Sequence, residues 1–417
     1  MHVVPTVIFY IVTFLAVYVQ VFFLVTFFEK RNKIVYRPDI KLKNYPRVTI
    51  TVPCFNEEKT IFRTVKSLLE LDYPKDKIEI FLIDDGSTDS TWKVIKRFDK
   101  YSNIRALKKE NGGKYTALNW GLDHSIGEFF GCLDADSFVH PLALKRILKY
   151  FEKSKETMAV APSVTVYEPK SIIQKAQTIE YHMSVYNKKM LAFMGAINVT
   201  PGPFSIFRKR VFDELGPYRK AHNTEDQEIA LRMQKHGYKI DHCPDAYVYT
   251  QSPKTVMKLY RQRIRWVYGF IKNFMDYRDI LFKKKYGNIA FFTLPAGIIS
   301  IGGIVFLLAN FLWGMVAILA EQIVKIQTVG FSSGIHFNFE WFYVDTKAIF
   351  FLLVILYVLV ITSTMIGRKI AERKTSLSPS IIYFFFVYSF IAPFWIVKAL
   401  FNAVRSKETS WIAERKI

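Results

Sequence analysis

The sequence predicts a water-soluble α/β domain placed between membrane-spanning helices. Four long runs without a charged residue flank a charged central segment of roughly residues 30–285. Within that segment, short β-branched runs alternate with stretches whose apolar residues recur at helical spacing, which predicts parallel strands joined by helices. The uncharged runs predict membrane helices, because about 20 apolar residues cross a bilayer.

The uncharged runs are residues 5–28, 289–320, 348–367 and 375–397. We expect the first to be an uncleaved anchor, because it is longer than the apolar part of a signal peptide and Glu29–Lys33 follows it without a small-residue cleavage site. The basic residues of that segment place the central domain in the cytoplasm. The sequence therefore predicts a multi-pass protein of the cell (plasma) membrane with a cytoplasmic domain.

The C-terminal runs raise a question of membrane topology. The basic segment 368–374 is expected on the cytoplasmic side, and three single crossings would then place the basic tail 405–417 outside. We expect a cytoplasmic tail instead. Either the last run, broken at Pro393, enters and leaves on one side, or the run 289–320 forms more than one element.

The charge and the cysteines restrict the partners and the compartment. The net charge is +22, but no nucleic-acid-binding motif accompanies it, so we expect no nucleic acid partner. Membrane lipids with anionic headgroups and an anionic, phosphate-bearing substrate are the expected partners. The three cysteines, Cys54, Cys132 and Cys243, lack the spacing of a metal site, which favours a reducing compartment without disulfides.

Polar residues follow three predicted strands of the central domain. The strands are 47–53, 78–83 and 128–133, and the helices between them include 60–71 and one beginning at Ser90 or Thr91. Ligands bind at the carboxyl ends of the strands in such sheets. The residues expected around one crevice are Pro53, Asp84, Asp85, Asp134 and Asp136.

Asp134 and Asp136 are one residue apart at a strand end, so both side chains would lie on one face. Such a pair suits a hard divalent cation that also binds a phosphate, although a polar turn is the commoner explanation of the pattern alone. Similarly, Gly112-Gly113-Lys114 before a helix fits either a phosphate contact or a solvated turn.

Four motifs together resemble those of glycosyltransferase family 2, which has the GT-A fold. They are Asp84-Asp85 within 83–89, Asp134-Ala135-Asp136, Thr224-Glu225-Asp226, and Gln262-Arg263-Ile264-Arg265-Trp266. The last matches the Gln-x-x-Arg-Trp signature of the family's processive branch, which includes cellulose, chitin, hyaluronan and poly-N-acetylglucosamine synthases. The resemblance covers about residues 46–285, and it implies a GT-A domain over 46–250 followed by amphipathic interface helices over 251–285. An anchor over 1–30 and a membrane region over 286–417 complete the expected organisation.

The resemblance implies a role for each motif on the donor side. Asp84 and Asp85 would hold the uridine of a UDP-sugar, helped by Pro53, Glu57 and Lys114. Asp134 would lie near the ribose, and Asp136, with Asp134 beside it, would bind Mg²⁺ or Mn²⁺ on the diphosphate. Arg265 would contact the pyrophosphate, and Gln262 would also bind the nucleotide sugar.

Other residues would act on the acceptor. Asp226 is the expected general base, with Thr224 capping a helix through Met233 and Glu225 beside it; alternatively, the two acids only complement a helix dipole. Gly202 and Phe204 would lie near the acceptor sugar, and Trp266 would stack on it. Residues 256–282 also have the pattern of a basic membrane-surface helix, and 171–193 fits either a second one or an ordinary domain helix.

We therefore expect an inverting transferase that extends a β-linked polysaccharide or oligosaccharide acceptor from a UDP-sugar, with UDP-N-acetylglucosamine favoured, and that translocates the product. The alternative is a non-processive transferase that adds one sugar to a lipid-linked acceptor. A non-catalytic membrane receptor is disfavoured, since none of the expected acidic residues is missing.

Overall fold

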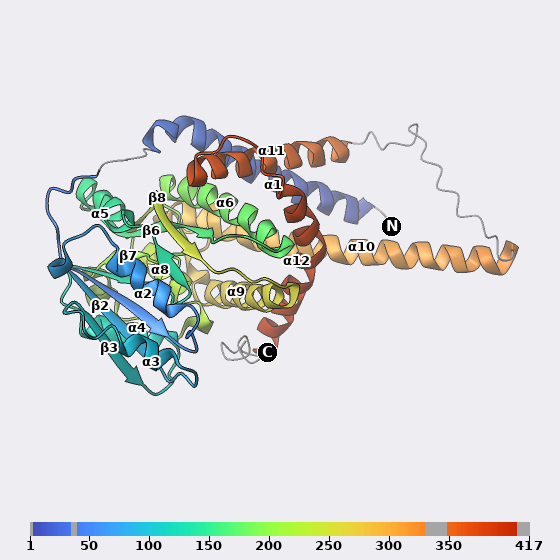
Figure 1. Ribbon diagram of the computed structural model, residues 1–417. Helices are drawn as coiled ribbons and strands as arrows, with labels where there is room; N and C mark the ends of the chain where they lie inside the picture. The colour runs from blue at the N-terminus through green and yellow to red at the C-terminus, as the bar shows by residue number, and fades with distance from the viewer. Residues whose placement is uncertain (1–2, 35–39, 330–347, 407–417) are drawn as a thin grey trace.

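A mixed α/β domain lies on one side of the molecule and long helices extend from the other (Figure 1). This computed structural model describes residues 3–34, 40–329 and 348–406. The strands in these ranges are β1 (Val48–Cys54), β2 (Ile78–Asp85), β3 (Ile104–Lys109), β4 (Phe129–Cys132), β5 (Ser137–Val139), β6 (Thr157–Val166), β7 (Ile206–Arg208) and β8 (Lys239–Thr250). They form one eight-stranded sheet in the order β3-β2-β1-β4-β7-β6-β8-β5.

The three strands expected from the sequence are neighbours in this sheet. β1 lies between β2 and β4 and is parallel to both, with Cys54 opposite Asp84 and Thr51 opposite Cys132. The carboxyl ends of these strands therefore meet at one edge, which confirms the predicted α/β arrangement. β7 is antiparallel to β4 and β6, and β5 is antiparallel to β8, so the sheet is mixed.

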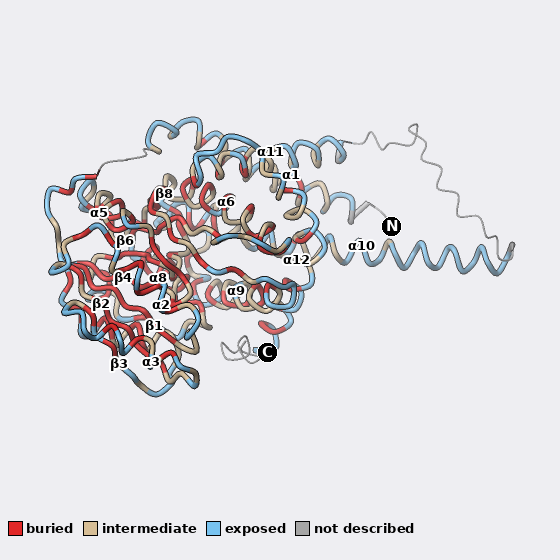
Figure 2. The backbone as a smooth tube through the Cα atoms, viewed as in Figure 1, coloured by how far each residue is buried: buried red, intermediate tan, exposed pale blue. Residues whose placement is uncertain are grey.

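Helices cover both faces of the sheet. The helices of the domain are α2 (Ile61–Leu69), α3 (Thr91–Lys96), α4 (Lys114–Asp123), α5 (Ala143–Lys153), α7 (Arg210–Leu215) and α8 (Glu225–Lys235). α2, α3 and α5 contribute to one apolar core, and α4, α7 and α8 contribute to a second. The spacing of Ile61, Val65 and Leu68 places all three on the buried face of α2, as the periodicity predicts. Figure 2 shows the buried backbone concentrated in this domain.

Four helices of the described chain are long and apolar enough to cross a membrane. They are α1 (Val3–Lys30), the π-helical turn Ile289–Thr293 continued by α10 (Leu294–Val329), α11 (Ala348–Glu372) and α12 (Ile381–Val404). α1 contacts both α10 and α11. In the view of Figure 1, α1, α10 and α11 run in similar directions, whereas α12 runs across them.

Two further helices connect the domain with the long helices. α6 (Ile172–Phe193) begins with a capping box of Ser171 and Gln174 and packs against β6, β8, α11 and α12. α9 (Val256–Asp276) packs mainly against α12 and ends at Asp276, not at Phe282 as expected. Short 3₁₀ turns complete the structure at Arg31–Lys33, Lys75–Lys77, Ala221–Asn223, Arg278–Ile280 and Lys284–Tyr286.

The expected break in the C-terminal runs is not observed. α12 is one helix that continues through Pro393, and residues 289–329 are one unbroken helical segment. A proline inside a helix removes one backbone hydrogen bond without necessarily ending the helix when the surroundings support it. Residues 407–417 of the tail lie outside the described residues, so the side of the membrane that it occupies stays a prediction.

Candidate active site

One cavity of about 690 Å³ brings together most of the residues singled out in the sequence. It lies between the carboxyl edge of the sheet and helices α6, α8, α9 and α12. The residues from the sequence prediction that line it are Pro53, Glu57, Lys114, Asp134, Asp136, Gly202, Thr224, Glu225, Asp226, Gln262, Arg265 and Trp266. The four motifs are far apart in the chain, so the fold brings at least three of them to one place.

Phe204 does not line this cavity, contrary to the expectation that it packs near an acceptor. Its side chain is fully buried in the core of the domain, and its backbone N–H donates to the Cys132 carbonyl at 2.7 Å. The backbone at Phe204 has a φ of 65°, in the left-handed region. The turn therefore directs the ring inward, where burial of an aromatic side chain is favourable.

Asp84 and Asp85 are buried at the end of β2 and do not line the cavity either. Asp85 accepts hydrogen bonds from Lys109 Nζ (2.5 Å), Gly112 N (3.1 Å) and Gly113 N (2.9 Å), so it holds the loop before α4. Asp84 Oδ1 accepts from Ser87 N at 3.0 Å, and its Oδ2 has no hydrogen-bond partner in the described chain. The contacts of Asp84 and Asp85 with a nucleotide therefore stay predictions.

Lys114 lies at the centre of a cluster of charged side chains in the cavity. Its ammonium lies 2.8 Å from carboxylate oxygens of both Asp134 and Glu225. Burial alone would lower the pKa of Lys114, but the attraction of the two carboxylates outweighs burial and raises that pKa well above its usual value. A Cβ at Gly202 would lie 2.7 Å from Lys114 Nζ, so a larger residue at this position would displace the Lys114 side chain.

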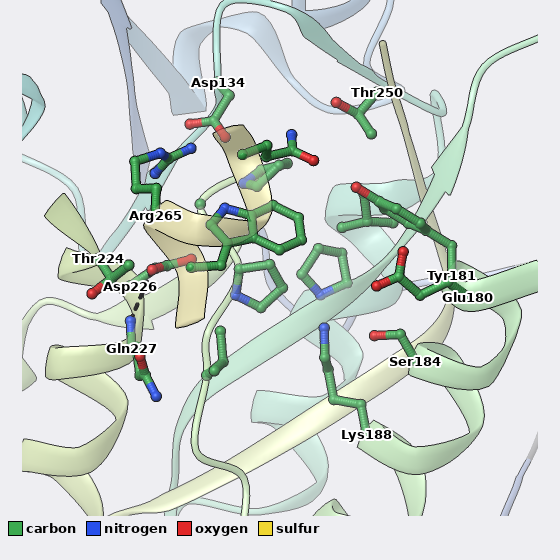
Figure 3. A pocket seen from close by; sticks show the side chains of 18 of the residues that line it. Asp134, Glu180, Tyr181, Ser184, Lys188, Thr224, Asp226, Gln227, Thr250 and Arg265 are labelled. Atoms are coloured by element: carbon green, nitrogen blue, oxygen red, sulfur yellow. Dashed lines mark hydrogen bonds between the residues drawn. The ribbon is translucent and has the colours of Figure 1, made fainter. Parts of the chain in front are cut away.

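Asp226 and Glu225 are adjacent but differ in electrostatic environment. Burial and the negative charge of Glu225 raise the pKa of Asp226 to about 6. Burial acts against ionisation of Glu225 as well, but its ion pair with Lys114 lowers its pKa. Figure 3 shows the Asp226 carboxylate at the cavity wall, where Oδ1 accepts from Gln227 N at 2.9 Å. Asp226 is therefore the more basic carboxylate of the pair and the better proton acceptor.

A strained turn precedes these two acids. Ala221, His222 and Asn223 have φ values of 46°, 54° and 63°, which is unfavourable for three consecutive residues other than glycine. α9 holds the turn: Arg265 Nη1 donates to the Asn223 carbonyl (3.2 Å) and His222 Nε2 lies 2.9 Å from Asp276 Oδ2. The turn fixes where α8 begins and hence where Asp226 lies.

Thr224 occupies the N-cap position of α8, but its side chain makes no capping hydrogen bond, contrary to the expectation. Instead, Thr224 Oγ1 donates to the Ala221 carbonyl (3.0 Å) and accepts from Asn273 Nδ2 (2.8 Å). A Cβ at Gly269 would lie 2.3 Å from Thr224 Oγ1, so the glycine allows α9 to pack directly on this residue. Thr224 thus joins the turn to α9.

α9 presents the Gln262–Trp266 motif to the cavity. Gln262, Arg265 and Trp266 all line it, and Figure 3 shows Arg265 on the same side as Asp134 and Asp226. Gln262 Oε1 is buried and has no hydrogen-bond partner among the described residues. Trp266 is 37% exposed, and the Arg263 guanidinium lies 4.2 Å from the centre of its ring. The indole therefore offers a flat apolar surface to the cavity.

Asp134 and Asp136 are the candidate metal ligands. No cluster of three or more His, Cys, Asp or Glu residues suited to a metal ion occurs in the described chain. The pair nevertheless fits a hard cation of the magnesium type, which takes one or two protein carboxylates and completes its shell with water and substrate phosphates. Both residues line the cavity, and Ser137 Oγ donates to Asp136 Oδ1 at 3.1 Å, which orients that carboxylate.

Sequence reasoning missed the wall formed by α6 and α12. Glu180, Ser184 and Lys188 recur at helical spacing on α6 and line the cavity together with Tyr388 of α12. Glu180 Oε2 accepts hydrogen bonds from both Arg263 Nη2 and Tyr388 OH, so one carboxylate connects α6, α9 and α12. The i, i+4 spacing of polar residues in 171–193 was a usable signal, but it did not reveal which face met a cavity.

The chain is similar to known proteins over the domain and beyond. A family model described as glycosyl transferase family 2 matches residues 49–216. The poly-beta-1,6-N-acetyl-D-glucosamine synthase of Staphylococcus epidermidis is 33% identical over 224 residues, which are 53% of this chain and 54% of that protein. The protein of the same name from Staphylococcus aureus (strain COL) is 31% identical over 243 residues, 58% of each chain. The aligned region therefore spans little more than half the length of these relatives.

A solved structure has a similar fold. The mannosyltransferase PcManGT from Pyrobaculum calidifontis, in complex with GDP-Man and Mn²⁺, aligns with a TM-score of 0.59 and 18% identity. The alignment covers 95% of this chain and all of that one. The likeness therefore extends from the α/β domain into the long helices.

Proposed function

We propose that this chain, whose residues 49–216 match the family model described as glycosyl transferase family 2, is a membrane-embedded, inverting glycosyltransferase that extends a β-linked polysaccharide. The donor is a UDP-sugar, and the names of the relatives favour UDP-N-acetylglucosamine. The catalytic domain is cytoplasmic, and the long helices hold it at the membrane and serve translocation of the product.

The observation that carries the proposal is that the cavity contains both a carboxylate with a raised pKa and a separate cluster of charged side chains. Asp226, a carboxylate with a pKa of about 6, shares the cavity with the Lys114–Asp134–Glu225 cluster and with Asp136. Transfer of a sugar requires a proton acceptor for the attacking hydroxyl and positive charge at the leaving diphosphate. The cavity contains groups suited to both tasks.

The transfer step follows from these roles. The acceptor hydroxyl gives its proton to Asp226 while its oxygen forms a bond to C1 of the donor sugar. The bond between C1 and the diphosphate oxygen breaks, and its electron pair leaves on UDP. Because attack and departure occur on opposite faces of C1, the configuration is inverted.

The remaining residues bind and orient the substrates. Arg265 and Lys114 lie where they would contact the diphosphate, and the unpaired Oε1 of Gln262 would accept a hydrogen bond from the donor sugar. Mg²⁺ or Mn²⁺, held by Asp136 and Asp134, would supply positive charge that stabilises the leaving diphosphate. Trp266 would stack on the acceptor sugar.

The test is UDP release by the purified protein with a panel of UDP-sugars and Mg²⁺ or Mn²⁺, combined with sizing of the product. A high-molecular-weight polymer from one donor supports the synthase. A product with one added sugar on a lipid favours the non-processive alternative. Absence of UDP release with every donor, in the presence of both metals and of oligosaccharide and lipid acceptors, contradicts the proposal.

A further inference from the structure

The cavity contains a lysine that the transfer step described above does not use. Lys188 lies on the face of α6 that also carries Glu180 and Ser184, and all three line the cavity. Figure 3 shows its side chain extending from α6 into the cavity, on the opposite side from Thr224 and Gln227. In the view of Figure 3, Lys188 and Asp134 lie at opposite ends of the cavity, so we assign Lys188 to the acceptor half.

The neighbouring residue shows how this chain stabilises a buried lysine. Lys189 is 2% exposed, and its ammonium is bound by Asp241 Oδ1 at 3.1 Å and by the His242 carbonyl at 2.8 Å. Lys114 in the donor half is likewise paired with two carboxylates. Burying an ammonium without such partners is costly.

Lys188 lacks this compensation. No hydrogen bond or ion pair joins its ammonium to another residue of the described chain, although the side chain is half-buried in the cavity wall. Burial lowers the pKa of Lys188 to about 8, although the negative charge of Asp226 offsets part of this decrease. His242 does not balance the charge of Lys188, because its imidazole is neutral. Burial and the charges of Lys188 and Lys189 lower the pKa of His242 well below the usual value.

A second polar group on the same wall is also unsatisfied. Asn187 Oδ1 is buried, lines the cavity and has no hydrogen-bond partner among the described residues. Neighbouring donor and acceptor groups without partners are typical of a site whose ligand completes the hydrogen bonds. An anion at Lys188 with a hydroxyl near Asn187 would satisfy both.

Resting on the proposed function, we propose that Lys188 binds an anionic group of the acceptor, a phosphate or a carboxylate, close to the hydroxyl that Asp226 deprotonates. Lys188 and Asp226 line the same cavity. The bound anion therefore belongs to the acceptor and not to the donor diphosphate, which would lie at Asp134 and Asp136. Such an anion occurs in a lipid-linked phosphate or in an acidic sugar.

The test uses the full-length protein in nanodiscs with a saturating UDP-sugar donor and three acceptors of similar length. These are a neutral oligosaccharide, the same oligosaccharide ending in a uronic acid, and a polyprenyl phosphate. We expect a lower acceptor KM for one of the two anionic compounds than for the neutral one, and the preferred compound identifies the source of the anion. Lys188→Met should raise that KM roughly tenfold to a hundredfold, the range of a lost charge-assisted hydrogen bond, without changing the donor KM.

Two comparisons make the result specific. Lys188→Arg should restore most of the affinity, and Lys155→Met, which removes an exposed lysine outside the cavity, should change nothing. Equal use of neutral and anionic acceptors by the unaltered protein would overturn the inference. A shift of the pH profile in Lys188→Met without a change in acceptor KM would also overturn the inference. Lys188 would then influence the pKa of Asp226 and would not bind the acceptor. Failure of the unaltered protein to release UDP with any donor would instead contradict the proposed function.

Discussion

Lys114 lies 2.8 Å from the carboxylate of Glu225, and this ion pair explains why two adjacent acids have different proton affinities. The cation stabilises the charge of Glu225, and the negative charge of Glu225 then adds to burial in raising the pKa of Asp226. A general base works best when its pKa lies near the working pH. The ion pair thus prepares the neighbouring residue for proton transfer.

The pH dependence of transfer follows from this arrangement. Asp226 must be ionised to accept a proton, and its raised pKa of about 6 means that it becomes protonated as the pH falls through 6. We expect kcat/KM to rise with pH through a midpoint near 6 and to level off at higher pH. A pH–rate profile between 5 and 8 checks this expectation.

Lys114→Met provides the matching variant. Lys114 lowers the pKa of Asp226 directly, but it also keeps Glu225 charged, and that charge raises the pKa of Asp226. Removal of Lys114 should therefore shift the acidic midpoint in addition to reducing the rate. An unchanged midpoint, or a midpoint near 4 in the unaltered protein, would contradict the assignment of Asp226 as the base.

Metal dependence should reside in Asp136. Asp136→Ala should lower the rate roughly 100-fold or more, because a catalytic cation is worth several kcal/mol at the leaving diphosphate. Added Mn²⁺ should no longer stimulate the variant, and Asp76→Ala, which removes an exposed acid elsewhere, should behave as the unaltered protein. Full activity of the unaltered protein in excess chelator would rule out the metal site.

The contact between α9 and the turn at residues 221–224 should control activity from outside the cavity. Gly269→Ala would place a Cβ 2.3 Å from Thr224 Oγ1, which forces α9 and the turn apart. A displacement of about 1 Å in a catalytic group can cost about 100-fold in rate. We expect a large fall in kcat with the protein still folded.

Gly314→Ala is the matched control, since a Cβ at this glycine of α10 meets no atom within 4 Å. It should leave kcat unchanged, and thermal unfolding of both variants should be compared with that of the unaltered protein. Equal kcat values for the two variants would show that the turn tolerates the displacement.

The C-terminal tail should lie on the same side of the membrane as the catalytic domain. α12 packs against α6 and α9, which both line the catalytic cavity. The native cysteines are buried, so a membrane-impermeant maleimide should label only cysteines introduced at exposed positions. In intact cells, Ser406→Cys should resist labelling as Lys100→Cys in the domain does, whereas Thr328→Cys at the end of α10 should be labelled.

Permeabilised cells supply the control for that experiment, because all three variants should then react. Labelling of Ser406→Cys in intact cells would show that α12 carries the chain across the membrane, and would contradict the expected cytoplasmic tail.

The strand-end residues of the site could be predicted because short apolar runs identify the strands. Parallel pairing then brings the carboxyl ends of these strands to one edge of the sheet. Asp134, Asp136 and Pro53 follow from that logic, and their place in the cavity agrees with it. The helix containing Gln262 and Trp266 was also predictable from its spacing. Its end at Asp276 was not, since the 3₁₀ turn that follows has no strong sequence signal.

Other features depend on tertiary contacts that a single sequence does not encode visibly. The left-handed turn of Ala221, His222 and Asn223 contains no glycine and is stabilised by α9, which lies about 40 residues later in the chain. The inward direction of Phe204 and the use of Asp85 to hold a loop likewise result from packing. Lys188 was hidden among the many lysines, because only the fold shows which lysines line the cavity.

The most direct test of the central claim compares transfer and nucleotide binding in Asp226→Asn. The substitution keeps the shape of the side chain and removes only the base, so we expect transfer to fall by about 100-fold or more while UDP binding, measured by calorimetry, stays within a few fold. Glu156→Gln, at an exposed position, should affect neither. Transfer at the unaltered rate by Asp226→Asn would contradict the account, because no other residue in it accepts the proton.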